Sequence, residues 1–197
     1  MKGIKFFFVL LLISSLLLTG CSSKKIENEK NWPIESFEHI NQDGEKLSLS
    51  DLKGKIWIAN FIFTNCTTVC SPITANMARI QQLLAENDLQ NVEIISFSID
   101  PEVDTPEQLK SFAANFTEDL SNWHFLTGYV QPYIEQFAKD NFHLFVLKPE
   151  DDDQVMHGTD FFLVDQQGVV VKYYSALDIP YEELLQDIEV LVSRGSK

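Results

Sequence analysis

Two kinds of hydrophobic pattern alternate along this chain. Continuous apolar runs are typical of strands buried on both faces of a sheet, and two such runs fill residues 56–63 and 92–99. Shorter strands are predicted within 123–128, 142–148 and 161–175. Helices are predicted from apolar spacing and start signals within 72–87, 105–116, 130–141 and 180–194. Strands that alternate with helices predict an α/β fold, in which helices flank one central mixed sheet.

Two local signals refine this picture. Thr105 is followed by Pro106 and, at the third helical position, by Gln108, a pattern that resembles a capping box. Asp43-Gly44 is a turn signal, and the alternating residues after it predict a short strand pair. The fold is therefore expected to carry an extra N-terminal β-hairpin beside the central sheet.

The first twenty residues have a different character. Two lysines precede an apolar stretch over residues 6–18, and small residues then lead to Cys21. This is the order of an export signal, and its ending at Cys21 resembles the bacterial lipobox. The apolar run is short for the alternative, an uncleaved transmembrane anchor. We predict a lipoprotein signal peptide at 1–20, a lipidated Cys21 with a flexible linker over 21–31, and one folded domain over 32–197. The lipid would hold this domain on the extracytoplasmic face of the cell membrane.

The charge of the chain narrows the classes of partner. Its 15 Lys and Arg residues stand against 29 Asp and Glu residues, for a formal net charge of −14. Nucleic-acid binding depends on clustered basic side chains, so this composition argues against it. An acidic surface suits a basic partner or simply serves as a solvated face.

Two of the three cysteines form a pair. Cys21 is assigned to the lipid, which leaves Cys66 and Cys70 at the junction between a buried strand and a helix. In a helical turn, residues four apart share one face, and a helix N-terminus stabilises thiolates. The spacing therefore supports both a reversible disulfide and the binding of a soft metal ion. The alternatives are a permanent structural disulfide and two buried thiols. A disulfide that closes so short a loop removes little conformational entropy from the unfolded chain, which makes a structural disulfide a weak explanation.

A closed site for a soft ion needs a third donor, and the chain has four histidines. We expect His39 at the surface, His124 to pack in a short strand or lie at the surface, and His143 to pack in the core or at the edge of a strand. His157 lies in a loop directly ahead of the strand at 161–164. In a thioredoxin-like sheet that loop lies beside the cysteines, so His157 is the strongest candidate, with an ordinary loop histidine as the alternative.

Three sequence blocks carry a family resemblance. The segments NFIFTNCTTVCSPITANM, ISFSIDPEVDTPEQLKSFA and VMHGTDFFLVDQQGVVV resemble the signature blocks of the Sco/SenC proteins. These are thioredoxin-fold, membrane-tethered copper proteins that take part in assembling the dinuclear copper centre of cytochrome c oxidase. The first block is the most specific, because its cysteines have three residues between them and those of ordinary thioredoxins have two. The resemblance runs from about Trp32 to the terminal helix.

The resemblance implies a copper site made by Cys66, Cys70 and His157. Thiolate and imidazole donors suit Cu(I), and imidazole also suits Cu(II), so either oxidation state fits this set. When oxidised, Cys66 and Cys70 would form a disulfide. Asp100 and Asp104 stand in the shared acidic block and are candidates for orienting a ligand or contacting a partner. Their alternative roles are a turn and the start of a helix.

The resemblance implies a membrane-tethered metallochaperone that delivers copper to the copper-carrying subunit of cytochrome c oxidase. The alternative is a thiol–disulfide oxidoreductase that reduces the cysteines of that subunit, with Cys66 as the attacking sulfur. A peroxide-reducing enzyme lacks support, because no arginine lies close in sequence to the cysteines. Zinc is chemically reasonable for two cysteines and one histidine, and the resemblance favours copper.

Overall fold

The computed structural model describes residues 25–89 and 91–195 of the chain. A six-stranded mixed sheet has the order β1-β10-β9-β4-β5-β6. Its strands are β1 (Trp32–Pro33), β4 (Ile56–Ile62), β5 (Val92–Ser98), β6 (Trp123–Leu126), β9 (Asp160–Val164) and β10 (Val169–Ser175). The helices are α2 (Cys70–Glu86), α3 (Pro106–Ala113), α4 (Gln131–Phe142) and α5 (Tyr181–Gly195). Two small antiparallel pairs lie outside the sheet, β2 (Glu38–Ile40) with β3 (Lys46–Ser48) and β7 (Val146–Leu147) with β8 (Met156–His157).

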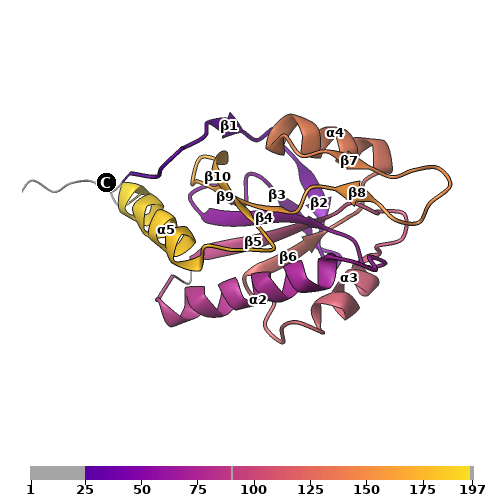
Figure 1. Ribbon diagram of the computed structural model, residues 1–197, viewed down its shortest axis with the longest axis horizontal. Coiled ribbons are helices and arrows are strands. Elements are labelled where there is room, and N and C mark those ends of the chain that lie inside the picture. The colour runs from indigo at the N-terminus through magenta and orange to yellow at the C-terminus, as the bar shows by residue number, and fades with distance from the viewer. Residues whose placement is uncertain (1–24, 90, 196–197) are drawn as a thin grey trace, which may run out of the picture.

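The central strand β4 divides the interior into two cores. It pairs in parallel with β5 and antiparallel with β9, and every one of its residues is buried. Ile58 and Ile62 belong to a core with side chains of α2, α3 and α5, whereas Trp57 and Phe61 belong to a core with α4. Figure 1 shows α4 on one side of the sheet and α2 with α3 on the other. The predicted α/β fold with a mixed sheet and an N-terminal hairpin, here β2–β3, is confirmed.

The predicted capping box is also present. The Thr105 side chain accepts from the backbone N–H of Gln108, and the Gln108 side chain accepts from the backbone N–H of Thr105. The strand predicted over 142–148 is wrong in its first half. Helix α4 continues to Phe142 and ends at His143, whose φ of 52° lies in the left-handed region. His143 packs edge-on against Trp32, with ring centroids 4.3 Å apart, so it is a helix cap and not a strand residue.

The described part of the linker predicted over 21–31 packs against the folded domain. Ile26 is buried in the core beside α5, and the backbone N–H of Lys30 donates to the carbonyl oxygen of Val171 at 2.7 Å. Apolar burial and edge pairing therefore hold this segment against the sheet. Cys21 and the predicted signal peptide lie outside the described residues. Within the described ranges, no helix combines the length and apolarity needed to cross a bilayer.

Candidate metal centre

The cysteine pair lies where β4 gives way to α2. A loop leaves the sheet after the buried Phe63, and α2 begins at Cys70, two residues earlier than predicted. The backbone N–H of Cys70 donates to Cys66 Sγ at 3.3 Å, so the first helical amide is directed at the other sulfur. Both cysteines are thiols, with Cys66 half-buried and Cys70 buried. The structure therefore brings this pair together at a helix N-terminus, as the spacing predicted.

The two sulfurs differ in their electrostatic surroundings. Burial opposes ionisation of Cys66, but hydrogen bonds from Cys70 and Thr68 outweigh it and lower the pKa of the Cys66 thiol. Burial raises the pKa of the Cys70 thiol, and its hydrogen bond to Cys66 adds to this rise. Cys66 is therefore the sulfur that ionises first, and it is also the more accessible of the two.

Asp104 anchors the start of the cysteine loop. It is fully buried, and its carboxylate accepts from the backbone N–H of Thr64 at 3.1 Å and from the Thr64 hydroxyl at 2.6 Å. Ser98 Oγ donates to the other carboxylate oxygen at 2.6 Å. Burial raises the pKa of Asp104. Asp104 therefore holds the chain two residues ahead of Cys66 and also precedes the helix that Thr105 caps.

Asp100 has a different partner. Its side chain is 1% exposed and accepts from Lys148 Nζ at 2.6 Å. Lys148 directly follows β7, so this ion pair ties the β7–β8 hairpin to the end of β5. The carbonyl oxygen of Asp100 also accepts from the backbone N–H groups of Val103 and Asp104, which makes the turn expected there.

His157 lies on β8, where it pairs in register with Val146. Its ring meets the ring of Phe63 edge-on, with centroids 6.0 Å apart. The Nδ1–H group can donate to the carbonyl oxygen of Gly158, 2.7 Å away, which leaves the Nε2 lone pair for a metal. Burial lowers the pKa of His157 and so favours the neutral ring that a metal requires.

A second tie joins the hairpin to the cysteine loop. The backbone N–H and the hydroxyl of Thr67 both donate to Gln154 Oε1 at 3.3 Å, and Gln154 Nε2 donates to the carbonyl oxygen of Asn65 at 3.1 Å. The segment ahead of His157 therefore lies beside the cysteines, as predicted. Among the described residues, no three His, Cys, Asp or Glu side chains are yet close enough to hold a metal ion.

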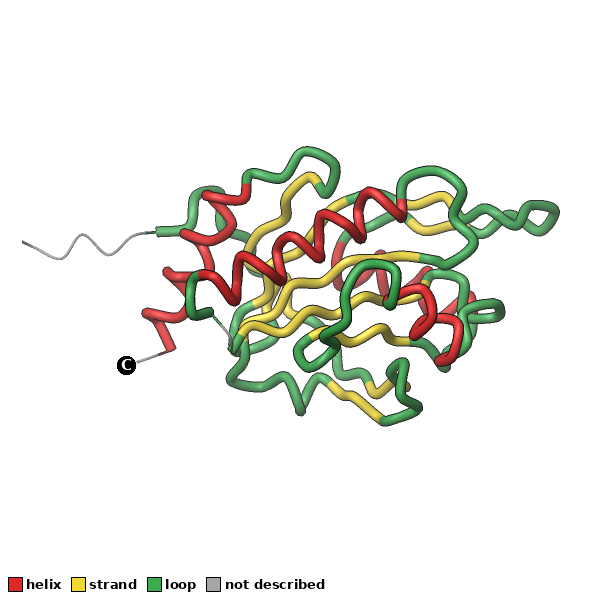
Figure 2. The backbone as a smooth tube through the Cα atoms, turned by 90° about the horizontal axis from the view of Figure 1, so that it is seen from below, coloured by secondary structure: helices red, strands yellow, loops and turns green. Residues whose placement is uncertain are grey.

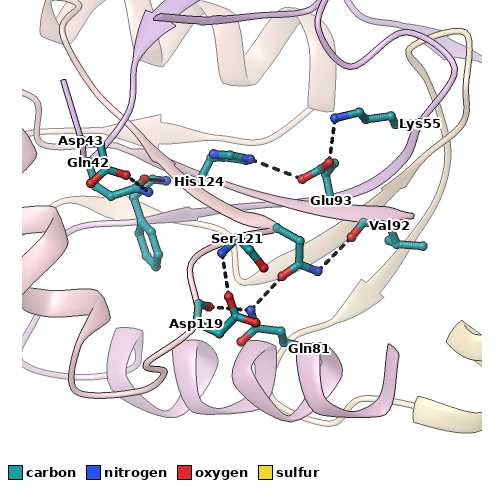
Figure 3. Close-up of polar contacts among 11 residues, drawn as sticks. Gln42, Asp43, Lys55, Gln81, Val92, Glu93, Asp119, Ser121 and His124 are labelled. Atoms are coloured by element: carbon teal, nitrogen blue, oxygen red, sulfur yellow. Dashed lines mark hydrogen bonds and ion pairs between the residues drawn. The ribbon is translucent and has the colours of Figure 1, made fainter. Parts of the chain in front are cut away.

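His39 and His124 lie in surroundings that differ from those of His157. The prediction that His39 lies at the surface is wrong, because it is 7% exposed. Its ring stacks on Phe37 and meets Tyr129 edge-on. Burial lowers the pKa of His39 to about 4. His124 is half-buried on β6 and points towards Glu93, with 3.3 Å between Nε2 and the carboxylate (Figure 3). His124 therefore contacts a carboxylate on the neighbouring strand β5.

The SCO1/SenC family model matches residues 26–193 of the chain. The chain belongs to the SCO1/SenC family. The SCO1 protein homolog of Bacillus subtilis is 46% identical over 88% of this chain and 90% of its own length. The SCO1/SenC family lipoprotein of Bacillus anthracis has a crystal structure that is 50% identical, covers 85% and 99% of the two chains and superposes with a TM-score of 0.83.

Two further Sco structures are described with a disulfide switch and with bound copper. BsSco is described with a disulfide switch and as a member of the Sco family of cytochrome c oxidase assembly proteins. It is 46% identical, covers 85% of this chain and 98% of its own, and has a TM-score of 0.79. ScoI of Bradyrhizobium japonicum, solved with copper bound, is 23% identical, covers 81% and 99%, and has a TM-score of 0.67. The thioredoxin-like fold is thereby confirmed.

Proposed function

We propose that this protein is a membrane-tethered metallochaperone for the dinuclear copper centre of cytochrome c oxidase. Family membership, the copper bound in related structures and the assembly role described for BsSco support this proposal. The observation that carries it is the contact between the His157 hairpin and the cysteine loop, made by Gln154 with Thr67 and Asn65. Two thiolates and one neutral imidazole would form a donor set that suits copper.

In this proposal Cys66 and Cys70 hold copper through sulfur and His157 holds it through Nε2. The accessible Cys66 side of the pair would admit the thiols of a partner. Copper then leaves by ligand exchange, in which each incoming sulfur replaces one donor of this chain. The hairpin contributes by supplying or withdrawing the imidazole as it moves.

Copper analysis of the reduced protein tests the ligand set. We expect one tightly bound copper per wild-type chain, and a large loss of affinity in Cys66→Ala and His157→Ala. His124→Ala is the matched control, because His124 is also half-buried but pairs with Glu93. A His157→Ala protein that binds copper as tightly as the His124→Ala control would contradict the assignment of His157.

A thiol–disulfide oxidoreductase is the second candidate function. The adjacent thiols and the unequal pKa values of Cys66 and Cys70 favour it, as does the disulfide switch described for the BsSco relative. A dithiol that reduces a partner disulfide acts without copper. This function predicts reduction of a disulfide-bonded substrate domain by the metal-free protein, lost in Cys66→Ser and unchanged in His157→Ala. Loss of that activity in His157→Ala would contradict it.

We further propose that Cys21 carries the lipid that tethers the domain to the extracytoplasmic face of the membrane. The description of the Bacillus anthracis relative as a lipoprotein supports this. Cys21→Ser should release the protein from the membrane fraction, because the acyl chains supply the membrane affinity. Retention of Cys21→Ser in the membrane would contradict lipid anchoring.

A further inference from the structure

The β7–β8 hairpin presents two different faces. Side chains alternate along a strand, and on the inner face Val146 and Val155 are each 6% exposed beside His157. On the outer face Leu147 pairs in register with Met156, and these side chains are 39% and 51% exposed. Phe145, two residues before Leu147 on the same face, is 63% exposed. These three side chains, Phe145, Leu147 and Met156, form one outer apolar face.

This face is unusual for a solvated hairpin. Large apolar side chains that are exposed singly are normal, but contiguous ones mark interaction sites. Leu147 and Met156 are direct cross-strand neighbours, and Phe145 is next along the same face, so the three are contiguous. The inner face already packs on the core. No folding requirement therefore places these three apolar side chains outside.

The turn of the hairpin is strongly acidic. Glu150, Asp151, Asp152 and Asp153 are all exposed. No Lys or Arg stands between Lys148 and Lys172 in the sequence, and Lys148 is committed to Asp100. In Figures 1 and 2 this turn extends beyond the rest of the chain, at the end opposite the C-terminus. The four acidic side chains thus concentrate negative charge in solvent beside the outer apolar face.

We propose that the outer apolar face and the acidic turn of the β7–β8 hairpin dock the protein that receives copper from this site, through an apolar patch rimmed by Lys and Arg. The acidic turn selects a basic rim and speeds encounter, while Phe145, Leu147 and Met156 fill the apolar centre. The partner would be seated on the element that carries His157. This inference rests on the proposed function and adds the surface and chemistry of its partner.

Two other occupants fit this surface less well. A second copy of this chain would bring its own acidic turn against the first, and like charges oppose that contact. The first described residues do not cover it, because they lie at the end of the molecule opposite the hairpin turn (Figure 1). A basic partner is therefore the occupant that the charge favours.

The test measures binding and copper transfer to the soluble copper-receiving domain of the oxidase subunit, as separate readouts. One hairpin variant removes apolar surface, Phe145→Ser with Leu147→Ser. The other removes charge at constant shape, Glu150→Gln with Asp151→Asn, Asp152→Asn and Asp153→Asn. The matched control is Leu177→Ser with Val192→Ser, since these side chains are 51% and 41% exposed. None of the variants alters Cys66, Cys70, His157 or the side chain of Gln154.

Both hairpin variants should bind copper like the wild type, yet bind the partner domain at least about tenfold more weakly and transfer copper more slowly. The control variant should match the wild type. Added salt should weaken wild-type binding and have little effect on the charge variant. Partner binding that is absent in the wild type or unchanged in both variants would overturn the docking surface. So would a wild-type dimer that the hairpin variants dissociate. Hairpin-dependent binding without copper transfer would leave the docking surface standing and overturn the metallochaperone function instead.

Discussion

The ion pair between Asp100 and Lys148 allows a quantitative test of how the hairpin is held. The Asp100 side chain is 1% exposed and that of Lys148 is 17% exposed, with 2.6 Å between Nζ and Oδ1. Lys148→Ala would leave a buried carboxylate without its counter-charge. Breaking one side of a buried pair costs about 3–5 kcal/mol. Because Lys148 keeps some contact with water, we expect the free energy of unfolding to fall by about 3 kcal/mol.

The assay is urea denaturation followed by tryptophan fluorescence and circular dichroism. Lys46→Ala is the control, because Lys46 forms an ion pair of the same 2.6 Å length with Glu38 at the surface. The side chain of Lys46 is 75% exposed and that of Glu38 is 57% exposed. Exposed pairs contribute little to stability, so the control should behave almost like the wild type. Asp100→Asn combined with Lys148→Met should recover much of the lost stability, since no unpaired charge remains. Equal denaturation midpoints for Lys148→Ala and Lys46→Ala would refute this reasoning.

Three further predictions concern other parts of the molecule. Burial lowers the pKa of His39 from 6.5 in the unfolded chain to about 4 in the folded protein. The buried neutral ring therefore contributes its full stability above pH 6.5, and this contribution is lost as the pH falls to 4. In His39→Phe, the loss in free energy of unfolding between about pH 7 and pH 4 should be smaller by up to about 3 kcal/mol. Urea denaturation midpoints between pH 4 and 7 measure this, and a pH profile equal to that of the wild type would contradict it. Asp104→Ala should lower the free energy of unfolding by at least about 2 kcal/mol, because the half-buried Thr64 and the buried Ser98 lose their acceptor. It should also speed alkylation of Cys66, and unchanged alkylation would show that Asp104 does not hold the loop. Thr105→Ala should lower stability by about 1 kcal/mol through loss of the cap, and thermal unfolding equal to that of the wild type would contradict it.

Features encoded by neighbouring residues could be predicted from the sequence. The all-buried β4 follows from one apolar run, and the capping box lies within four residues. The pairing of Cys66 with Cys70 depends only on a helical start between them. The position of its loop made His157 the strongest candidate of the four histidines, and the family resemblance then implied its role as a ligand.

Features that depend on distant segments could not be predicted in the same way. His39 lies among polar residues in the sequence, which predicts a surface position. In the fold, the rings of Tyr129 and Tyr133, which are distant in sequence, pack against it and bury it. The ties from Lys148 to Asp100 and from Gln154 to Thr67 span 48 and 87 residues. Their residue types are common on surfaces, so only the fold reveals that they hold the hairpin against the end of β5 and the cysteine loop.

The central claim is that Cys66, Cys70 and His157 together bind one copper ion. X-ray absorption spectroscopy at the copper edge reads the donor atoms directly, on the wild-type protein and on His157→Ala loaded with equimolar copper. The account predicts two sulfur donors and one imidazole nitrogen in the wild type, with the nitrogen signal lost in His157→Ala. A wild-type spectrum with sulfur donors alone, or an imidazole signal that persists in His157→Ala, would contradict it.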